Sequence, residues 1–254
     1  MIRLRTNQLM RTFCCLALFF VFAHVLTLVA RYHFGFGKLG GLIPLFDLDH
    51  ERNLPTCFST FLAVFCSALL ALIAKCREQA SQPWLLWAML ALAFFFIGLD
   101  DIAELHEHLS TPLRRILHTG GLFYYAWIIP YGAAALILAV SYYRFVFEMP
   151  PRIRNLMITS AMVFMSGALG LEMLGAWYFE MAKIENTLSY GIITMIEESL
   201  EMLGLIIFLY SLLIYIETVQ KNIYINLGTH AALTAIHSPQ ESEAELISIE
   251  AAIR

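Results

Sequence analysis

Charged side chains are scarce in this chain, because only 14% of its 254 residues are Asp, Glu, Lys or Arg. No block of basic residues is present and the net charge is −4, which argues against a nucleic-acid-binding protein. The five cysteines lack the CxxC spacing that is typical of zinc sites, so we expect them to act as small hydrophobic side chains. The composition thus points away from nucleic-acid binding and from cysteine-based metal sites.

Hydrophobic residues make up 59% of the chain, and the mean hydropathy is +0.70. Apolar windows of roughly 20 residues, the length that crosses a bilayer as a helix, recur along the sequence. A β-barrel would show short alternating segments, whereas Leu85 to Leu99 is a continuous apolar run. We therefore predict an all-α, polytopic integral membrane bundle with six transmembrane helices, near residues 12–31, 55–75, 83–105, 121–143, 155–179 and 188–216.

The distribution of basic residues predicts how the helices are oriented. Cytoplasmic segments of membrane proteins are enriched in Lys and Arg. If the N-terminus is inside, ten of the 16 Lys and Arg residues fall in cytoplasmic segments and six fall outside. The apolar stretch after Arg11 is too long for an ordinary signal peptide, so we expect an uncleaved first helix. The prediction is a multi-pass protein of the inner (cytoplasmic) membrane with both termini inside.

Three connecting regions are informative. Residues 32–54 are expected to form an ordered outer loop, which could also cover part of the bundle as a lid, and Asn53 and Pro55 should begin the second helix. Pro130 should kink the fourth helix, since proline removes a backbone hydrogen bond. Residues 217–254 turn polar and acidic and are predicted to form a cytoplasmic tail, either a solubilising segment or a partner-binding helix.

Acidic and histidine side chains interrupt three of the apolar segments. They are Asp100, Asp101, Glu104, His106, Glu107 and His108 at the end of the third, Glu172 in the fifth, and Glu197, Glu198 and Glu201 in the sixth. A charged side chain at the bilayer centre costs about 2.5 to 3.5 kcal/mol, so such residues usually face the bundle interior and serve a function. At ~1.5 Å per residue, Asp101, Glu172 and Glu197 all lie roughly 10 to 14 Å below the outer surface. We therefore predict one shared site in the outer half of the bundle.

Helical geometry divides the residues of the third segment. On a continuous helix each residue advances by about 100°, which places Asp101, Glu104 and His108 within about 60° of each other. His106 then points away from that face. His24, His50 and His118 are further histidines whose participation the sequence does not decide.

Carboxylates that crowd in a low-dielectric interior repel one another unless protons or a cation compensate. No Lys or Arg lies in the interior of the apolar windows. The compensating charge must be protons, a metal, or Arg114 and Arg115 folding in from the rim. Oxygen ligands with one or two imidazoles suit iron, manganese or zinc. The predicted metal ligands are Asp100, Asp101, Glu104, His106, His108, Glu172, Glu198 and Glu201, and the predicted catalytic bases are Glu107 and Glu197.

The pattern differs from known carboxylate-bridged metal sites in helical bundles. Those sites normally use Glu-x-x-His on two helices, whereas this chain has Glu104-x-x-x-His108 on one. A proton relay and a structural polar network that fixes helix register are alternatives to a bound metal.

Three motifs resemble those of an uncharacterised family of polytopic bacterial membrane proteins. They are Asn53-Leu54-Pro55-Thr56-x-Phe58-Ser59, Asp100-Asp101-x-x-x-Leu105-His106-Glu107 and Glu197-Glu198-x-x-Glu201-Met202-x-Gly204. The resemblance covers about residues 45–205. The second motif more commonly reads Asp-Glu in that family, where this chain has Asp100-Asp101. The resemblance implies a role for His106, which a kink or unwinding near the helix end would reconcile with its position, and it implies no activity.

Three classes of function are compatible with these observations. A membrane metalloenzyme, either an oxidoreductase or a hydrolase, would use the metal as a Lewis acid beside a free carboxylate base. A proton or cation carrier would use the same acids for transport, although the inner half of the bundle has few polar groups. An accessory subunit would dock a membrane-protein partner or a second copy through its lipid-facing helices or its tail. The lipid bilayer is the one partner common to all three.

Overall fold

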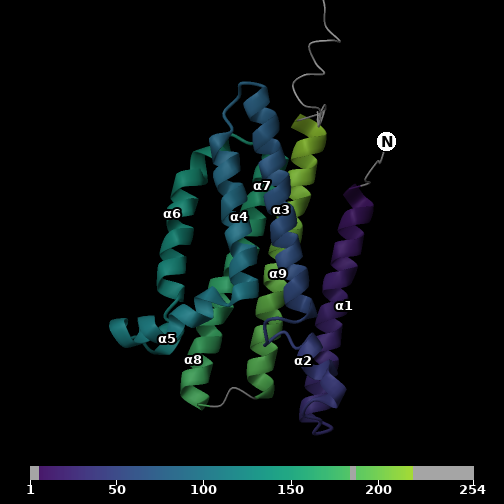
Figure 1. The fold of residues 1–254 in the computed structure, drawn as a ribbon, viewed down its shortest axis with the longest axis vertical. Coiled ribbons are helices and arrows are strands. Elements are labelled where there is room, and N and C mark those ends of the chain that lie inside the picture. The colour runs from purple at the N-terminus through teal and green to yellow at the C-terminus, as the bar shows by residue number, and fades with distance from the viewer. Residues whose placement is uncertain (1–5, 184–186, 220–254) are drawn as a thin grey trace, which may run out of the picture. The chain divides into compact units, whose positions relative to one another are not determined.

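The computed structural model describes residues 6–183 and 187–219. Its described part is helical, and six stretches are long and apolar enough to cross a membrane (Figure 1). They are α1 (Thr6–Tyr32), α3 (Leu54–Gln79), α4 (Leu85–Ala103), α6 (Ile128–Phe147), Pro151–Ala182 and α9 (Leu188–Val219). The all-α fold, with six stretches long and apolar enough to span a membrane, is thus confirmed within the described residues. Beyond Val219, the predicted tail lies outside them.

The long helices run up and down beside one another (Figure 1). The Thr6 hydroxyl at the start of α1 donates a hydrogen bond to the Glu217 carboxylate near the end of α9, so the described chain begins and ends at the same end of the bundle. The opposite end carries the short elements. They are η1 (Leu39–Gly41), α2 (Leu42–Phe46), α5 (Leu105–Leu117) and η2 (Gly121–Phe123).

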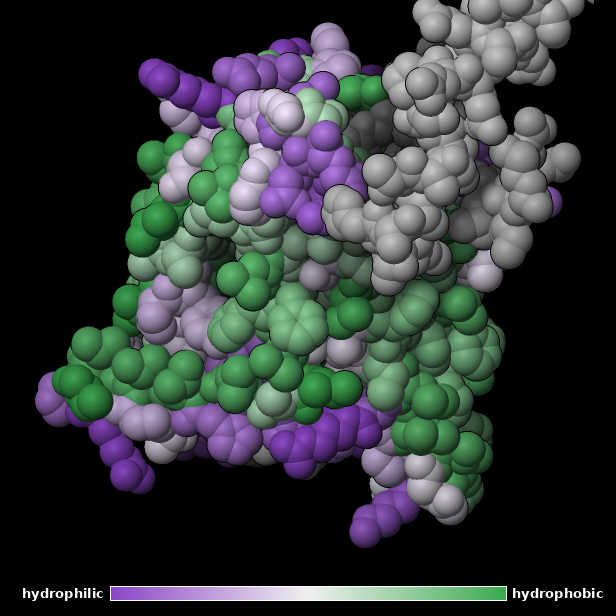
Figure 2. Space-filling view, turned by 45° about the horizontal axis from the view of Figure 1, so that its top comes forward, coloured by the Kyte–Doolittle hydropathy of each residue, from purple (hydrophilic) through white to green (hydrophobic). Residues whose placement is uncertain are grey.

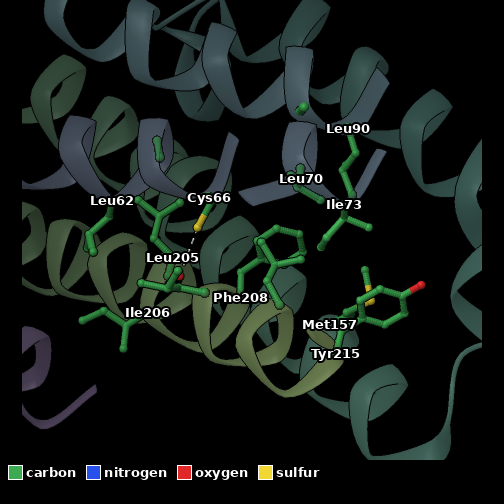
Figure 3. Packing of buried hydrophobic residues seen from close by; sticks show 14 of the residues in the cluster. Leu62, Cys66, Leu70, Ile73, Leu90, Met157, Leu205, Ile206, Phe208 and Tyr215 are labelled. Atoms are coloured by element: carbon green, nitrogen blue, oxygen red, sulfur yellow. Dashed lines mark hydrogen bonds between the residues drawn. The ribbon is translucent and has the colours of Figure 1, made fainter. Parts of the chain in front are cut away.

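Helix α9 forms the centre of the apolar core. Met202, Leu209 and Tyr215 on this helix are almost completely buried, and Figure 3 shows the neighbouring side chains that surround Leu205 and Phe208. The Phe208 ring stacks on Phe94 of α4 with 4.3 Å between ring centroids. Because lipid is as apolar as these side chains, close packing rather than escape from water holds such helices together. The core therefore follows α9 and extends to Phe20, Leu48 and Phe58 beside the loop before α3.

The outer surface of the bundle is apolar. Leu18, Leu92, Leu136 and Met162, from four different spans, are each at least 66% exposed. Figure 2 shows hydrophobic side chains over the middle of the visible face and hydrophilic ones toward both ends. A band of this kind is what a bilayer would cover, and it fits a multi-pass membrane protein.

The fifth span contains an irregular segment. Helix α7 (Pro151–Met165) passes into a π-helical turn at Ser166–Leu171, called η3, and then into α8 (Glu172–Ala182). Gly167 lies in this turn, and a Cβ added there would come within 2.8 Å of the Glu197 carbonyl oxygen. The absence of a side chain thus lets the turn approach α9 where the acids of α9 begin. Single π-helical turns are frequently found at functional sites.

Two expectations about helix geometry are wrong. Pro130 is the third residue of α6, where no intrahelical partner for its nitrogen is needed, so it lies in the first turn instead of kinking the middle of the helix. The predicted helix over 83–105 ends at Ala103, because Glu104 adopts the left-handed conformation with φ 54°. A new helix, α5, starts at Leu105 and lies across the direction of the long helices (Figure 1).

Candidate functional site

The break at Glu104 changes which side chains of this region face the bundle. With α5 turned across the end of α4, Asp101, Glu104 and His108 do not share a helical face, and the expectation that they do is wrong. Glu104 instead pairs with Arg52 at 2.8 Å, and the His108 ring lies 2.6 Å from the Glu104 carbonyl oxygen. His106, which a continuous helix would have pointed away, faces the interior.

Asp100 fixes the position of His106. One carboxylate oxygen accepts the backbone N–H of His106 at 3.1 Å, and the other lies 3.0 Å from Nδ1 of the same residue. The Tyr131 hydroxyl on α6 donates a third hydrogen bond to Asp100 at 2.8 Å. The imidazole ring also packs on Trp127, with 4.7 Å between ring centroids. The ring orientation is therefore set by groups at the end of α4 and the start of α6.

The loop before α3 brings a second set of polar side chains to the same place. Asn53 caps α3 as predicted, because its side chain accepts the Thr56 backbone N–H at 3.0 Å, and Pro55 lies in the first turn. The Asn53 amide also donates to the backbone carbonyl oxygens of Asp47 and His50. These bonds shape residues 47–53, which carry Asp49, His50 and Glu51 toward the interior. The loop thus contributes to the site.

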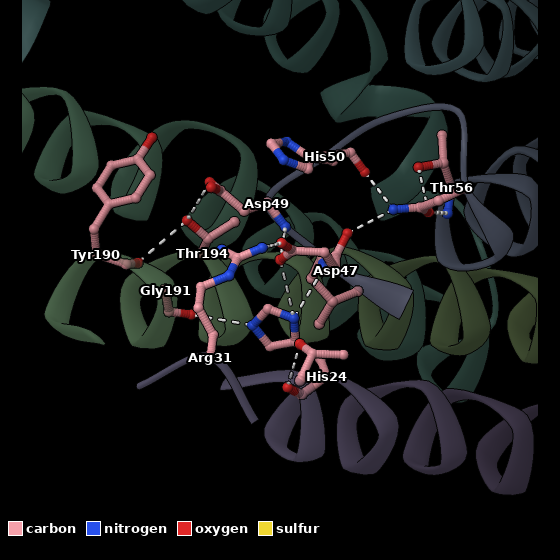
Figure 4. Close-up of polar contacts among 12 residues, drawn as sticks. His24, Arg31, Asp47, Asp49, His50, Thr56, Tyr190, Gly191 and Thr194 are labelled. Atoms are coloured by element: carbon pink, nitrogen blue, oxygen red, sulfur yellow. Dashed lines mark hydrogen bonds and ion pairs between the residues drawn. The ribbon is translucent and has the colours of Figure 1, made fainter. Parts of the chain in front are cut away.

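A buried ion pair holds this loop against α1 and α9 (Figure 4). Asp47, whose side chain is 1% exposed, accepts a hydrogen bond from Arg31. His24 accepts the Leu48 backbone N–H at its Nδ1, 2.9 Å away, and its Nε2 lies 3.4 Å from the Gly191 carbonyl oxygen. One ring nitrogen of His24 thus holds the loop and the other contacts α9, so neither is available as a ligand.

An acid-lined cavity of about 780 Å³ lies between the loop, α5 and the long helices. Nine carboxylic acids line it, and their order along the chain is Asp49, Glu51, Asp100, Asp101, Glu107, Glu172, Glu197, Glu198 and Glu201. Among the described residues that line it, Arg114 is the one Lys or Arg. The cavity therefore gathers a large excess of acidic groups over basic ones.

Three of these side chains have the geometry of a cation site. A ligand atom from each of Glu51, His106 and Glu107 lies within 4.8 Å of the others. The His106 Nε2 is 3.5 Å from a Glu51 oxygen, while its Nδ1 faces Asp100. The second Glu51 oxygen is buried and has no hydrogen-bond partner among the described residues. Buried polar atoms are almost always partnered, so this oxygen faces a place where a cation or a donor is needed.

The charges of these residues reflect their surroundings. Burial raises the pKa of Glu51 to about 8, although the nearby His106 opposes the shift. Burial of the His106 ring works against its protonation, but the hydrogen bond to Asp100 and the charge of Glu51 raise its pKa to about 9. Partial burial also raises the pKa of Glu107, and burial together with the charge of Asp47 raises that of Asp49 to about 7. The group thus holds protons strongly when no other cation is bound.

The deeper acids are individually supported by neighbouring groups. Thr60 of α3 donates to Asp101 at 2.9 Å, and the Trp127 indole donates to Glu172 at 3.2 Å. Glu197 is 9% exposed, whereas Glu198 and Glu201 are half-buried, with access from the cavity. These acids come from α4, α8 and α9, so the predicted meeting of three spans takes place in the structure.

The structure separates the predicted residues into two groups. Asp100, Asp101, His106, Glu107, Glu172, Glu197, Glu198 and Glu201 line the cavity together. Glu104 and His108 lie apart from its lining, at the break between α4 and α5. Glu51 and Asp49 are not among the residues predicted from the sequence, although the expectation that the loop could act as a lid was the signal that would have found them. Of the undecided histidines, His50 lines the cavity and His24 supports the loop.

These features define a helical, multi-pass membrane protein with an acid-lined cavity near one end of its bundle. A family model described as a domain of unknown function (DUF8692) matches residues 6–216, and the chain belongs to this family. No curated protein and no solved structure matches the chain. The family description names no activity, so the function has to be inferred from the site itself.

Proposed function

We propose that this is a metal-dependent membrane enzyme that binds a divalent transition metal ion, such as manganese, iron or zinc, at the mouth of the acid-lined cavity. The ligands would be Glu51, His106 and Glu107. The observation that carries the proposal is the environment of His106, whose Nδ1 is held by Asp100 while Nε2 faces Glu51. Histidines that bind metals almost always donate their other ring N–H to a carboxylate or carbonyl group, which fixes the tautomer.

The unpartnered Glu51 oxygen supports the same proposal. It is buried beside the His106 ring and the Glu107 carboxyl group, and a cation would satisfy it. Carboxylate and imidazole ligands together suit manganese, iron and zinc better than soft metals. A bound metal would supply Lewis acidity, or would lower the pKa of a bound water molecule.

The remaining acids would then serve the reaction. Glu197 is buried at the cavity wall and lies outside the group of three ligand residues, so we assign it the role of general base. Glu107, which the sequence predicts to be a catalytic base, is a metal ligand in this proposal. Asp100 would be a positioning residue, because it acts on the metal through His106.

The proposal includes the membrane orientation. The protein would lie in the cytoplasmic membrane, with the start of α1 and the end of α9 on the inner side and the cavity in the outer half. This orientation accords with the excess of basic residues in the segments on the inner side. A carrier is less well supported. The polar lining ends near Leu205, and beyond it Leu209 and Leu212 of α9 are almost completely buried in the apolar core.

Elemental analysis of the detergent-purified full chain tests the metal site. We expect wild-type protein to hold one transition metal ion per chain and the Glu51→Gln, Glu107→Gln double variant to lose it. Glu104→Gln is the matched control, because Glu104 is close in sequence but pairs with Arg52 outside the cavity lining. Wild-type protein that is metal-free after purification without chelators, and that takes up neither Mn²⁺ nor Zn²⁺ on dialysis, would overturn the proposal.

A further inference from the structure

The cavity continues from its acidic end into an apolar region between α4, α6 and α7. Ala93 and Phe96 of α4, Ala135 and Leu138 of α6, and Phe164 and Leu169 of the fifth span line this part. A single space therefore has one end rich in carboxylates and another end formed by hydrocarbon side chains. That division matches a molecule with a polar head and an apolar chain.

Helix α6 leaves this space open. Its Tyr131 hydroxyl donates to Asp100 at 2.8 Å, and its Tyr142 hydroxyl donates to the Leu86 carbonyl oxygen at 2.7 Å. Tyr131, Ala135, Leu138 and Tyr142 share one helical face, within about 60° of each other. The two tyrosines join α6 to α4 at both ends of this face, whereas the short side chain of Ala135 between them leaves the cavity unfilled.

The apolar region reaches the lipid-facing surface of the bundle. Phe96 and Leu138 line the cavity, yet their side chains are 46% and 37% exposed. From Tyr131 to Leu138 the helix rises about 10 Å, which is the length of cavity wall available to a hydrocarbon chain. A molecule dissolved in the bilayer could therefore enter sideways between α4 and α6, without crossing the water layer.

The acidic end specifies the head group. If Glu51, His106 and Glu107 hold a metal, Glu172, Glu197, Glu198 and Glu201 still line the cavity. A protonated primary amine brings a positive charge and three N–H donors to such a group. It has no acceptor atom, so it places no lone pair against a carboxylate oxygen. An anionic head would face the same acids with repulsion.

We infer that the cavity binds a single-chain amphiphile with a protonated amine head, which enters from the bilayer between α4 and α6. The chain would lie along Ala135 and Leu138, and the amine would contact the acids of α9. The inference deepens the proposed function and rests on it in taking the acidic end of the cavity as the reactive end. Binding of the amphiphile's alkyl chain requires no metal.

Photo-crosslinking of the full-length protein in lipid nanodiscs tests the inference. The probe is dodecylamine with a diazirine on its chain, and labelled peptides are mapped by mass spectrometry. We expect labels on α6 near Ala135 and on the fifth span near Leu169. Unlabelled dodecylamine should compete about tenfold better than dodecanoate of the same chain length, since one unfavourable charge contact is worth on the order of a tenfold change in affinity.

Two tryptophan substitutions on α6 provide a matched pair. Ala135→Trp would fill the cavity, and we expect about tenfold less labelling. Ala133→Trp, at an exposed position on the opposite face of the helix and outside the cavity lining, should leave the labelling unchanged. Ala135→Leu makes the same comparison with a smaller side chain if the tryptophan variant does not fold.

The outcomes separate this inference from the metal proposal. Labelling that Ala135→Trp does not reduce, or that dodecanoate competes as well as dodecylamine, would overturn the inference and indicate ordinary contact with bilayer lipid. Preference for dodecanoate would place an anionic head near Arg114 and would also overturn it. Labelling is also measured on protein purified without chelators. If that protein holds no metal, takes up none on dialysis and still binds the amine, the inference stands while the metal proposal fails.

Discussion

Asp100 and His106 form a closed ring of hydrogen bonds across the break between α4 and α5. One oxygen of the Asp100 carboxylate accepts the His106 backbone N–H, and the other faces Nδ1 of the imidazole at 3.0 Å. The left-handed conformation of Glu104 between them makes this return possible, because it turns the chain back toward the end of α4. One aspartate thus fixes both the backbone and the side chain of the central histidine.

The Asp100→Asn substitution tests this relationship. An amide cannot accept hydrogen bonds at both of its terminal atoms, so we expect His106 to lose its fixed orientation while the bundle still folds. Loss of such a supporting carboxylate typically lowers metal affinity by about 10- to 100-fold. Equilibrium dialysis against Mn²⁺ or Zn²⁺ measures the change, and His108→Ala, outside the cavity lining, serves as the control. Equal affinity of Asp100→Asn and wild-type protein would contradict the positioning role of Asp100.

The stability of the metal-free protein should fall as the pH rises. The pKa of His106 is raised from 6.5 to about 9 in the folded protein, so its stabilising contribution is complete below 6.5 and is lost through 9. The pKa of Glu51 is raised from 4.5 to about 8, and its contribution is lost in the same direction. Both groups hold more protons in the folded state than in the unfolded state, which makes stability decrease with pH.

Thermal unfolding in detergent with a chelator present, followed by tryptophan fluorescence, measures this dependence between about pH 6 and 10. The His106→Gln variant should show a shallower decrease, because one of the two titrating groups is removed. Stability that rises over this range would show that His106 and Glu51 are not held in their protonated forms by the fold.

The helical fold could be predicted from the sequence because hydropathy records it directly. An apolar run such as Leu85 to Leu99 can satisfy its backbone groups in a membrane only as a helix. The meeting of Glu172 with the acids of α9 could also be predicted, since alternate spans place them at similar depth. These inferences use only chain direction and the rise per residue of a helix.

Which residues belong to the site depends on backbone conformations that cannot be predicted from the sequence. Glu104 takes a left-handed conformation that usually favours Gly or Asn, and without that break the histidines of this region are assigned to the wrong faces. Glu51 joins His106 only through the folding of a loop onto α1 and α9. The π-helical turn before Glu172 likewise changes the register of α8 relative to a regular helix.

Close packing of the fifth span on α9 should depend on Gly204. A Cβ added there would lie 2.7 Å from the Phe164 Cβ and 2.9 Å from its backbone nitrogen, so the two helices would have to separate. We expect Gly204→Ala to destabilise the protein by about 1 to 3 kcal/mol, the usual cost of overpacking. Gly132→Ala is the matched control, because the nearest atom to its added Cβ is Leu169 Cδ1 at 4.0 Å. Equal unfolding temperatures of the two variants in detergent would contradict this account of the helix contact.

The buried pair of Arg31 and Asp47 should be required for the loop that carries Glu51. Arg31→Gln would leave the Asp47 carboxylate buried and without its charged partner, and removing one member of such a pair costs about 3 to 5 kcal/mol. Because Arg31 is itself 20% exposed, we expect a loss near about 3 kcal/mol, at the lower end of this range. The Arg31→Gln, Asp47→Asn double variant should be more stable than Arg31→Gln alone, since it removes the uncompensated charge.

Lys75 and Glu78 provide the comparison, because they form a pair at 2.6 Å whose side chains are 65% and 42% exposed. Lys75→Gln should change stability by less than about 1 kcal/mol, as is usual for surface ion pairs. Unfolding in detergent gives both values, and metal uptake measured on the same samples links the loop to the site. If Arg31→Gln lowers stability and leaves metal uptake intact under folding conditions, the ion pair holds the bundle together but does not position Glu51. If it lowers both, while the double variant recovers stability alone, the loop geometry set by Arg31 is what brings Glu51 to His106.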